Sequence, residues 1–248
     1  MKELLAEIEL LKTELTNLRQ LDSYRIAEAL ELEYTYESNR IEGNTLTLIE
    51  TDLVINKGLT IGGKSMREHL EAINHTQAIV YIKEVVQNKI EFSETVLLNI
   101  HSLILRSIDH DNAGQYRKVQ VYIQGSKHIL PQPFLIAKQM EDYFLWYNEN
   151  KLLLHPVLLS AELHERLVSI HPFIDGNGRT ARLVMNLILL QQGFVIANLK
   201  GDVESRIKYY NSLEKAQLKN DKNDFLEIVA TEEKNALLQY LKIIKGEK

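Results

Sequence analysis

The sequence predicts a compact, all-α protein, and three observations lead to that expectation. Apolar residues recur at intervals of three and four along most of the chain, which is the period of an amphipathic helix. Of the 248 residues only 4 are proline and 11 are glycine, so few positions would interrupt a helix. Hydrophobic residues make up 45% and charged residues 25%, a balance that supports a large core and excludes a disordered chain.

The N-terminal region, residues 1–90, is expected to be a layer of helices. Its first helix has a heptad-like seam of apolar side chains spaced by four and three residues: Leu4, Ile8, Leu11, Leu15 and Leu18. That spacing fits a short coiled coil between two chains, which would make a homodimer. It fits equally a helix packed on the protein's own core. A second helix is expected from about Asp22 to Glu42.

Capping signals and periodicity predict the remaining helices. Thr47, with Glu50 three positions later, has the pattern of a capping box that opens a helix. Ser93 is a candidate N-cap for a helix that runs to Leu105. Periodicity predicts further helices at about 66–87, 134–147, 156–168, 203–217 and 224–244. With no internal repeat and no clear linker, residues 91–248 should fold together with the N-terminal layer.

One segment is predicted to leave the helical pattern. Val119–Ile123 alternates in the manner of a short strand, and Gly125 with Ser126 forms a turn signal. His128–Leu130 is predicted as a return strand that ends early because prolines follow it. The segment therefore predicts a small β-hairpin.

The most informative segment runs from His171 to Arg182 and reads His-Pro-Phe-Ile-Asp-Gly-Asn-Gly-Arg-Thr-Ala-Arg. The apolar run Leu183–Leu190 continues it as a buried helix, which Gly193 ends. The turn Asp175–Gly178 therefore lies at a helix N-terminus. Free backbone N–H groups and the positive end of the helix dipole make such a position a site for phosphate.

The side chains around this turn strengthen the prediction of a phosphate site. Glycine at positions 176 and 178 removes the Cβ atoms that would keep an oxyanion away from the N–H groups. Arg179 and Arg182 are three positions apart, so both should project from one helix face and clamp further phosphate oxygens.

A base and a metal ligand accompany the phosphate site. His171 titrates near neutral pH, so its neutral imidazole can take a proton from an incoming hydroxyl. Asp175 is a hard oxygen ligand, and a single carboxylate suits Mg²⁺, which takes its other ligands from water and substrate phosphates. Phe173 and Ile174 are expected to face the core and hold the loop.

This segment resembles the signature of the Fic (Fido) family of protein adenylyltransferases, His-Pro-Phe-x-Asp/Glu-Gly-Asn-Gly-Arg-x-x-Arg, and matches it at every specified position. The resemblance implies a helical Fic fold with its catalytic core in residues 91–248. It also implies transfer of AMP from Mg·ATP to a Tyr, Thr or Ser hydroxyl of a target protein or of the protein itself. Bifunctional relatives remove AMP as well.

The resemblance assigns a role to each matching position. His171 would be the general base and Asp175 the Mg²⁺ ligand. Five residues would contact the phosphates, the first three as an anion hole and the last two on the β- and γ-phosphates: Gly176, Asn177, Gly178, Arg179 and Arg182. Relatives that phosphorylate have lysine at position 178, which disfavours a kinase.

A second family-like pattern lies upstream, at Ser38–Asn44. Ser38 and Glu42 are four positions apart and share a helix face, and Gly43 is a plausible helix terminator. The pattern resembles the family's inhibitory helix, Ser/Thr-x-x-x-Glu-Gly/Asn, in its N-terminal placement. The resemblance implies that Glu42 pairs with Arg182, an arginine that would otherwise clamp ATP.

Two further segments have family-like features. The predicted hairpin resembles the family's flap, on which a target segment is laid, and implies docking at Val121, Tyr122 and Ile123. Tyr209 and Tyr210 resemble the place where the family contacts the nucleotide's base and ribose. A tyrosine pair on a helix is equally compatible with a position in the core.

Composition limits the partners and the location. The formal net charge of −5 gives no overall basic field for nucleic acid, and the chain has no cysteine for disulfides. No apolar run is long enough to cross a bilayer, and acidic residues near Met1 argue against a signal peptide. We expect a soluble, cytoplasmic protein that binds neither nucleic acid nor membrane.

Two alternatives remain open at this level. The loop reads phosphates, so the same fold could transfer another phosphate-containing group, such as UMP or phosphocholine. The chain could also be a catalytically silent regulator that uses its N-terminal helices to bind a partner.

Overall fold

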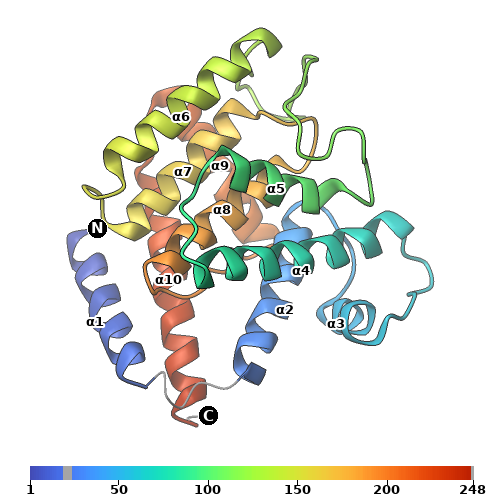
Figure 1. The fold of residues 1–248 in the computed structure, drawn as a ribbon. Helices are drawn as coiled ribbons and strands as arrows, with labels where there is room; N and C mark the ends of the chain where they lie inside the picture. Colours follow the sequence, from blue (N-terminus) through green and yellow to red (C-terminus); the bar gives the residue numbers. More distant parts are fainter. Residues whose placement is uncertain (19–23, 247–248) are drawn as a thin grey trace.

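The computed structural model describes residues 1–18 and 24–246, and the part of the chain that it describes contains helices and no strand (Figure 1). The predicted all-α class is confirmed. A short 3₁₀ helix, Pro133–Leu135, precedes the sixth of the α-helices, whose bounds are α1 (Lys2–Leu18), α2 (Tyr24–Ile41), α3 (Leu48–Lys57), α4 (Met66–Gln87), α5 (Glu94–Leu105), α6 (Ile136–Asn150), α7 (Pro156–Ile170), α8 (Asn177–Gln191), α9 (Val203–Lys219) and α10 (Asn223–Ile244). The predicted start of the second helix, Asp22, lies outside the described residues.

The capping signals form the caps that were predicted. The Thr47 side chain accepts a hydrogen bond from Glu50 N at 3.2 Å, and Glu50 Oε2 accepts one from Thr47 N at 2.7 Å, which completes the capping box of α3. Ser93 caps α5 through Val96 N. These bonds satisfy backbone groups that the first turn of a helix leaves unpaired, so the helix starts can be found from the sequence.

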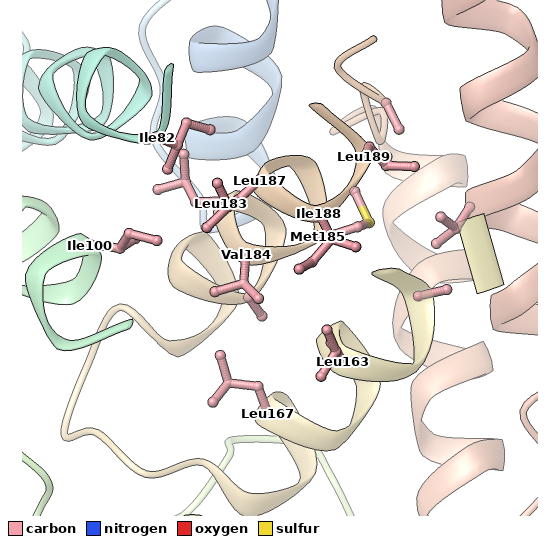
Figure 2. Packing of buried hydrophobic residues seen from close by; sticks show 14 of the residues in the cluster. Ile82, Ile100, Leu163, Leu167, Leu183, Val184, Met185, Leu187, Ile188 and Leu189 are labelled. Carbon is pink, nitrogen blue, oxygen red and sulfur yellow. The ribbon is translucent and has the colours of Figure 1, made fainter. Parts of the chain in front are cut away.

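Helix α8 forms the centre of the protein. Its residues from Leu183 to Leu189 are all buried, and all of them except Asn186 are apolar, so this part of the helix is surrounded by the core. Figure 2 shows Leu163 and Leu167 of α7 on one side of it, and Ile82 of α4 and Ile100 of α5 on another. Since α8 cannot shift within such a core, its N-terminus is a rigid platform for the loop before it.

The apolar seam of α1 packs within the chain. Ile8 and Leu15 are buried in the core, with Leu4, Leu11 and Leu18 partly buried against it. α1 lies beside α10, the last helix (Figure 1). Of the two interpretations of the seam, the structure contains the one in which it packs on the protein's own core.

A single hydrophobic cluster runs through residues on both sides of position 90, from Ile8 and Ile41 to Phe225 and Leu241. This shared core holds α2 and α4 against α8, so the N-terminal layer lies at the start of α8. Among the helices of residues 1–18 and 24–246, none has the length and apolar character required to cross a membrane.

The predicted hairpin strands do not form. Ser126 N donates to Ile123 O at 3.2 Å and Gly125 has a φ of 82°, so the predicted turn is present. The two arms, Val119–Ile123 and His128–Leu130, have no regular secondary structure and no ladder of backbone hydrogen bonds between them. The expectation of a β-hairpin was therefore wrong, and the segment is a two-armed loop.

Side chains occupy the carbonyls that a ladder would have used. Gln120 Nε2 donates to Leu130 O at 3.2 Å and Arg117 NH1 donates to Val119 O at 3.0 Å, both within the predicted strands. Arg117 NH2 also donates to Pro131 O, just beyond them, at 2.7 Å. Pro131 itself has no N–H to give. An isolated pair of strands is marginal without a third strand, so these side-chain bonds decide the conformation.

Candidate active site

The loop between α7 and α8 carries the predicted phosphate site. His171 caps the C-terminus of α7 with a left-handed backbone, at φ 52° and ψ 58°. Pro172 disfavours a right-handed helical backbone at the residue before it, so α7 ends there. Gly176, the N-cap of α8, is also left-handed at φ 76°, a conformation that glycine adopts without Cβ strain.

Buried hydrogen bonds close this loop on itself. Asn177 Oδ1 accepts from Phe173 N at 3.0 Å, and Asn177 Nδ2 donates to Phe173 O at 2.9 Å. The Phe173 ring stacks on His101, with centroids 3.6 Å apart. Because Gly114 N donates to His101 Nδ1, the histidine proton is on Nε2, which donates to Asp175 O at 3.0 Å. Burial lowers the pKa of His101 to about 4, so this support is neutral at pH 7.

We had expected Ile174 to face the core, and it does not. Phe173 fills the inner side of the loop and is fully buried, whereas the next side chain, Ile174, is 36% exposed. The expectation for Ile174 was wrong because adjacent residues of an extended turn point to opposite sides.

Replacing Asn177 with alanine is expected to lower the free energy of unfolding by about 2 kcal/mol, because the buried N–H and C=O of Phe173 would lose their partners. Urea denaturation measures the change. Asn56→Ala is the control, since Asn56 is exposed and its side chain bonds to Asp52 on the same helix. A loss no larger than that of the control would show that the loop does not depend on Asn177.

His171 presents a neutral imidazole to the site. Its Nδ1 lies 3.3 Å from Val168 O, and because a carbonyl can only accept, Nδ1 carries the proton. Nε2 therefore has a free lone pair, and it makes no hydrogen bond with any described residue. Burial lowers the pKa of His171 to about 4, and the positive charge of Arg117 acts in the same direction. Arg117 also fixes the histidine, since its Nε donates to His171 O at 2.8 Å.

The first turn of α8 faces a carboxylate. Within the described part of the chain, nothing accepts a hydrogen bond from the backbone N–H groups of Asn177, Gly178 and Arg179. A Cβ at position 178 would lie 2.3 Å from Glu42 Oε1, so glycine is what leaves room for this carboxylate. Glu42 therefore occupies a place to which a helix N-terminus attracts anions.

Glu42 is bound to Arg182, which is fully buried. Arg182 NH2 donates to Glu42 Oε1 at 2.7 Å and to Ser38 O at 2.8 Å, and Arg182 Nε donates to Ser38 Oγ at 2.9 Å. Burial alone would lower the pKa of Arg182, but the charge of Glu42 and the phenol of Tyr209 raise it above its usual value. The Ser38–Gly43 segment thus meets the Asp175–Arg182 segment at one guanidinium.

The other arginine, Arg179, belongs to a closed ring of four charges. Arg67 pairs with Asp175 Oδ2 and, through Nε, with Glu71 Oε1 at 3.2 Å. Arg179 NH1 lies 3.3 Å from Glu71 Oε1, and its NH2 lies 3.5 Å from Asp175 Oδ1. Burial would raise the pKa of Asp175, yet the charges of Arg179 and Arg67 with the Gly176 N–H hold it below its ordinary value.

The two arginines that were predicted to work side by side have different partners. Arg182 bonds to the end of α2, and Arg179 faces α4. Arg179 is buried, its NH1 is ion-paired with Glu71, and its Nε has no hydrogen-bond acceptor within the described residues. A buried guanidinium with an unpaired N–H is unusual, and an anion bound at this turn would supply the missing acceptor.

A cavity of about 440 Å³ opens beside the start of α8. It is bordered by the two predicted motifs, by the two-armed loop and by α9. Its lining residues are Glu42, Ile123, Gln124, Gly125, Ser126, Val168, His171, Gly178, Tyr209, Tyr210, Asn211, Leu213, Glu214 and Gln217. Its size is within the usual range for small-molecule sites. Of the predicted docking residues, Ile123 lines this cavity, Val121 is half-buried and Tyr122 is 86% exposed.

The two tyrosines of α9 lie at different depths. Tyr209 is buried, with its hydroxyl 3.1 Å from His164 Nε2 and 3.4 Å from Arg182 NH1. Tyr210 is partly exposed, and its hydroxyl donates to Ile41 O at 3.0 Å, which ties α9 to the end of α2. Burial raises the pKa of Tyr210 to about 12, so this donor keeps its proton.

Arg67, Glu71 and Asn44 were not predicted as parts of the site. Asn44 Nδ2 donates to Glu71 Oε2 and to Glu68 O, both at 3.0 Å, so it joins the upstream motif to α4. In sequence, Arg67 and Glu71 form an ordinary pair four positions apart, the spacing of an exposed helix face. The one available signal was Asn44, which directly follows the Ser38–Gly43 motif.

The fold and the site define a class: a helical protein in which a neutral histidine faces the free N-terminus of a buried helix. Residues 91–189 match the Fic/DOC family. The structure of Fic-1 (residues 134–508) from C. elegans is 32% identical, with a TM-score of 0.87 over 99% of this chain and 73% of that one. A Fic domain containing signaling protein from Bacteroides thetaiotaomicron is 29% identical, with a TM-score of 0.88 over 98% of both chains. The chain belongs to the Fic family.

Curated relatives add a named activity. The protein adenylyltransferase Fic of Drosophila melanogaster is 36% identical over 210 residues, which are 84% of this chain and 42% of that protein. The protein adenylyltransferase fic-1 of Caenorhabditis elegans is 37% identical over 215 residues, 86% of this chain and 41% of that protein. The chain therefore spans about two fifths of the length of these relatives.

Proposed function

We propose that the protein is an autoinhibited protein adenylyltransferase, which moves AMP from Mg·ATP to a Tyr, Thr or Ser hydroxyl of a protein target or of itself. The activity named for the curated relatives supports this function. Within this chain, one observation carries it: the free Nε2 of a neutral His171 borders the same cavity as the unpaired N–H groups at the start of α8.

His171 is the general base of the proposed step. The target hydroxyl gives its proton to His171 Nε2 while its oxygen attacks the α-phosphorus of ATP. A new P–O bond forms, the bond to the bridging oxygen breaks, and pyrophosphate leaves with the bonding electrons. The bond from Nδ1 to Val168 O aims Nε2 and stabilises the charge that the ring gains.

The helix start and the two arginines hold the phosphates. Gly176, Asn177 and Gly178 line the anion hole, to which Asn177 and Gly178 present unpaired N–H groups. Arg179 and Arg182 take the β- and γ-phosphates. The unpaired Nε of buried Arg179 supports this role, because an incoming phosphate would give it an acceptor. Preorganised donors of this kind stabilise charge on the transferring group without reorganisation.

Asp175 is the proposed ligand of Mg²⁺. The described residues contain no group of three or more acidic, histidine or cysteine side chains that could hold a metal by themselves. One partly exposed carboxylate at a phosphate site fits a cation that arrives with the nucleotide and keeps its waters. Bound there, Mg²⁺ would neutralise phosphate charge during transfer.

Glu42 is the proposed inhibitory residue. Its carboxylate occupies the helix N-terminus and the Arg182 guanidinium that the phosphates of ATP require. Ser38 supports it by fixing Arg182, and Gly43 ends the helix at φ 95° just beyond it. Productive binding of ATP therefore needs displacement of Glu42.

The rest of the cavity is proposed to hold the nucleoside and the target. Tyr210, with its neighbour Tyr209, is the proposed contact for base and ribose, because it is the partly exposed member of the pair. The loop 121–123 is proposed to register the target chain, since its backbone is not paired in a ladder and can bond to an added strand.

The pH dependence of transfer should follow His171. Its active form is the neutral one, and a pKa of about 4 keeps it neutral as pH falls through 6.5. We expect kcat/KM of Glu42→Gly to stay flat from about pH 8 to about pH 6 and to fall only below about pH 5. Initial rates at each pH measure kcat/KM, and circular dichroism at the same pH values shows whether the protein stays folded. An acid limb centred near 6.5 would contradict it.

The transferred group can be identified by mass. Glu42→Gly protein is incubated with ATP, UTP or a phosphocholine donor, and intact-mass spectrometry weighs the products. The proposal predicts added AMP from ATP alone. Addition of UMP or phosphocholine would point to another group transfer, and no addition from any donor would favour a silent regulator.

A further inference from the structure

Two charges of the site are already satisfied by side chains from the N-terminal layer. Glu42, at the end of α2, holds the cationic Arg182. Arg67, in the first turn of α4, holds the anionic Asp175. The Glu42–Arg182 pair explains how phosphate would be excluded, but it does not explain why Arg67 is bound to Asp175, the proposed metal ligand.

We propose that Arg67 stands in for the divalent cation at Asp175. Its guanidinium is bound to the carboxylate oxygen that Mg²⁺ would need. In the resting chain, Arg67 therefore blocks the metal position just as Glu42 blocks the phosphate position. The inference rests on the proposed function, because it concerns the metal that accompanies the nucleotide.

The donors around Asp175 separate into two kinds. Gly176 N bonds to Oδ1 at 2.6 Å and Arg179 NH2 lies 3.5 Å from the same oxygen. Both belong to the same loop and helix as Asp175 and would remain beside it when a metal binds. Arg67 comes from another element, α4, and among the described residues it is the one that bonds to Oδ2.

Exposure makes the contact reversible. The side chain of Arg67 is 55% exposed and that of Asp175 is 41% exposed, so the arginine can turn into solvent without crossing the core. An ion pair at this exposure contributes little, equivalent to about fivefold in an equilibrium constant. A divalent cation can displace such a contact, whereas a buried pair would exclude it.

The segments that carry Glu42 and Arg67 are joined by one network of hydrogen bonds. Arg67 Nε bonds to Glu71 Oε1, and Glu71 Oε2 accepts from Asn44 Nδ2 at 3.0 Å. Asn44 lies two residues beyond Glu42. Thr45 N and Oγ1 add bonds to Glu68 Oε1 at 2.9 and 2.6 Å, which lowers the pKa of Glu68 to about 2. The segment that carries Glu42 is therefore fixed to the turn that carries Arg67.

The test is the linkage between metal and nucleotide, measured by binding alone. Calorimetry gives the Kd of ADP in Mg²⁺ and in EDTA for wild type, Arg67→Met and a charge-matched control, Arg106→Met, on the exposed end of α5. ADP is the probe because it lacks the γ-phosphate that would meet Glu42. We expect the ratio of the two Kd values to rise about fivefold in Arg67→Met only, with the Kd in EDTA within about twofold of wild type.

Other results would overturn the inference. An unchanged ratio would leave Arg67 as a surface pair, and weaker binding in EDTA would make it a phosphate ligand. If Arg67→Met unfolds at lower temperature than wild type, Arg67→Gln replaces it with the same expectation. Absence of ADP binding in every variant, Glu42→Gly included, would overturn the proposed function too, whereas metal-linked binding without AMP transfer would overturn that function alone.

Discussion

Alanine in place of His171 is expected to lower the rate of AMP transfer by about 10²- to 10⁴-fold while leaving nucleotide affinity within about twofold. The substitution removes Nε2, the one free lone pair of a neutral histidine in the cavity lining. The N–H groups of α8 and both arginines stay in place, so the phosphates keep their partners. Incorporation of label from α-labelled ATP measures transfer, and calorimetry measures affinity.

His110→Ala is the control for this variant, because the His110 side chain is 89% exposed and is not among the residues that line the cavity. It should match wild type in both measurements. Transfer by His171→Ala within tenfold of the parent would reject His171 as the base. A parallel loss of affinity would instead make it a binding residue.

Glycine in place of Glu42 is expected to raise the transfer rate by about 10- to 100-fold. The substitution removes the charge-assisted bond to Arg182, which at about 1.5–3 kcal/mol corresponds to a factor of that size. It also clears the carboxylate from Gly178. Initial rates of label incorporation at matched protein and ATP concentrations measure the gain.

Two further variants separate the charge from other effects. Glu42→Gln keeps the size of the side chain and loses its charge, so it should give a smaller increase. Asp111→Gly removes an acidic residue from a turn where its side chain is fully exposed, and it should change nothing. Equal incorporation by Glu42→Gly and wild type would eliminate Glu42 as an inhibitor.

The parts of the site that could be predicted are local in sequence. The position of the turn at Asp175–Gly178 follows from glycines before an apolar run, because helix starts depend on nearby backbone and side-chain groups. The capping box of α3 and the N-cap of α5 are local for the same reason. The match to the Fic signature then brought the family, which the structural relatives confirm.

The parts that failed depend on tertiary contacts. The strands at 119–130 were predicted from alternation, but Arg117 and Gln120 take the carbonyls that a ladder would need. A second feature that depends on tertiary contacts is the ring of charges formed by Arg67, Glu71, Asp175 and Arg179. It forms only when α4 packs against the start of α8, and no spacing in the sequence predicts that contact. The seam of α1 was ambiguous because α10 and a second chain would offer it the same apolar partner.

The source of the transferred atoms tests the central claim most directly. Glu42→Gly protein is incubated with Mg·ATP labelled either at the α-phosphate or at the γ-phosphate, with Glu42→Gly/His171→Ala as the paired control. If the protein is an adenylyltransferase, we expect protein-bound label from α-labelled ATP only, and no label in the double variant. Label from γ-labelled ATP would show phosphorylation, and equal α-label in both variants would show transfer that does not use His171, so either result would contradict the account.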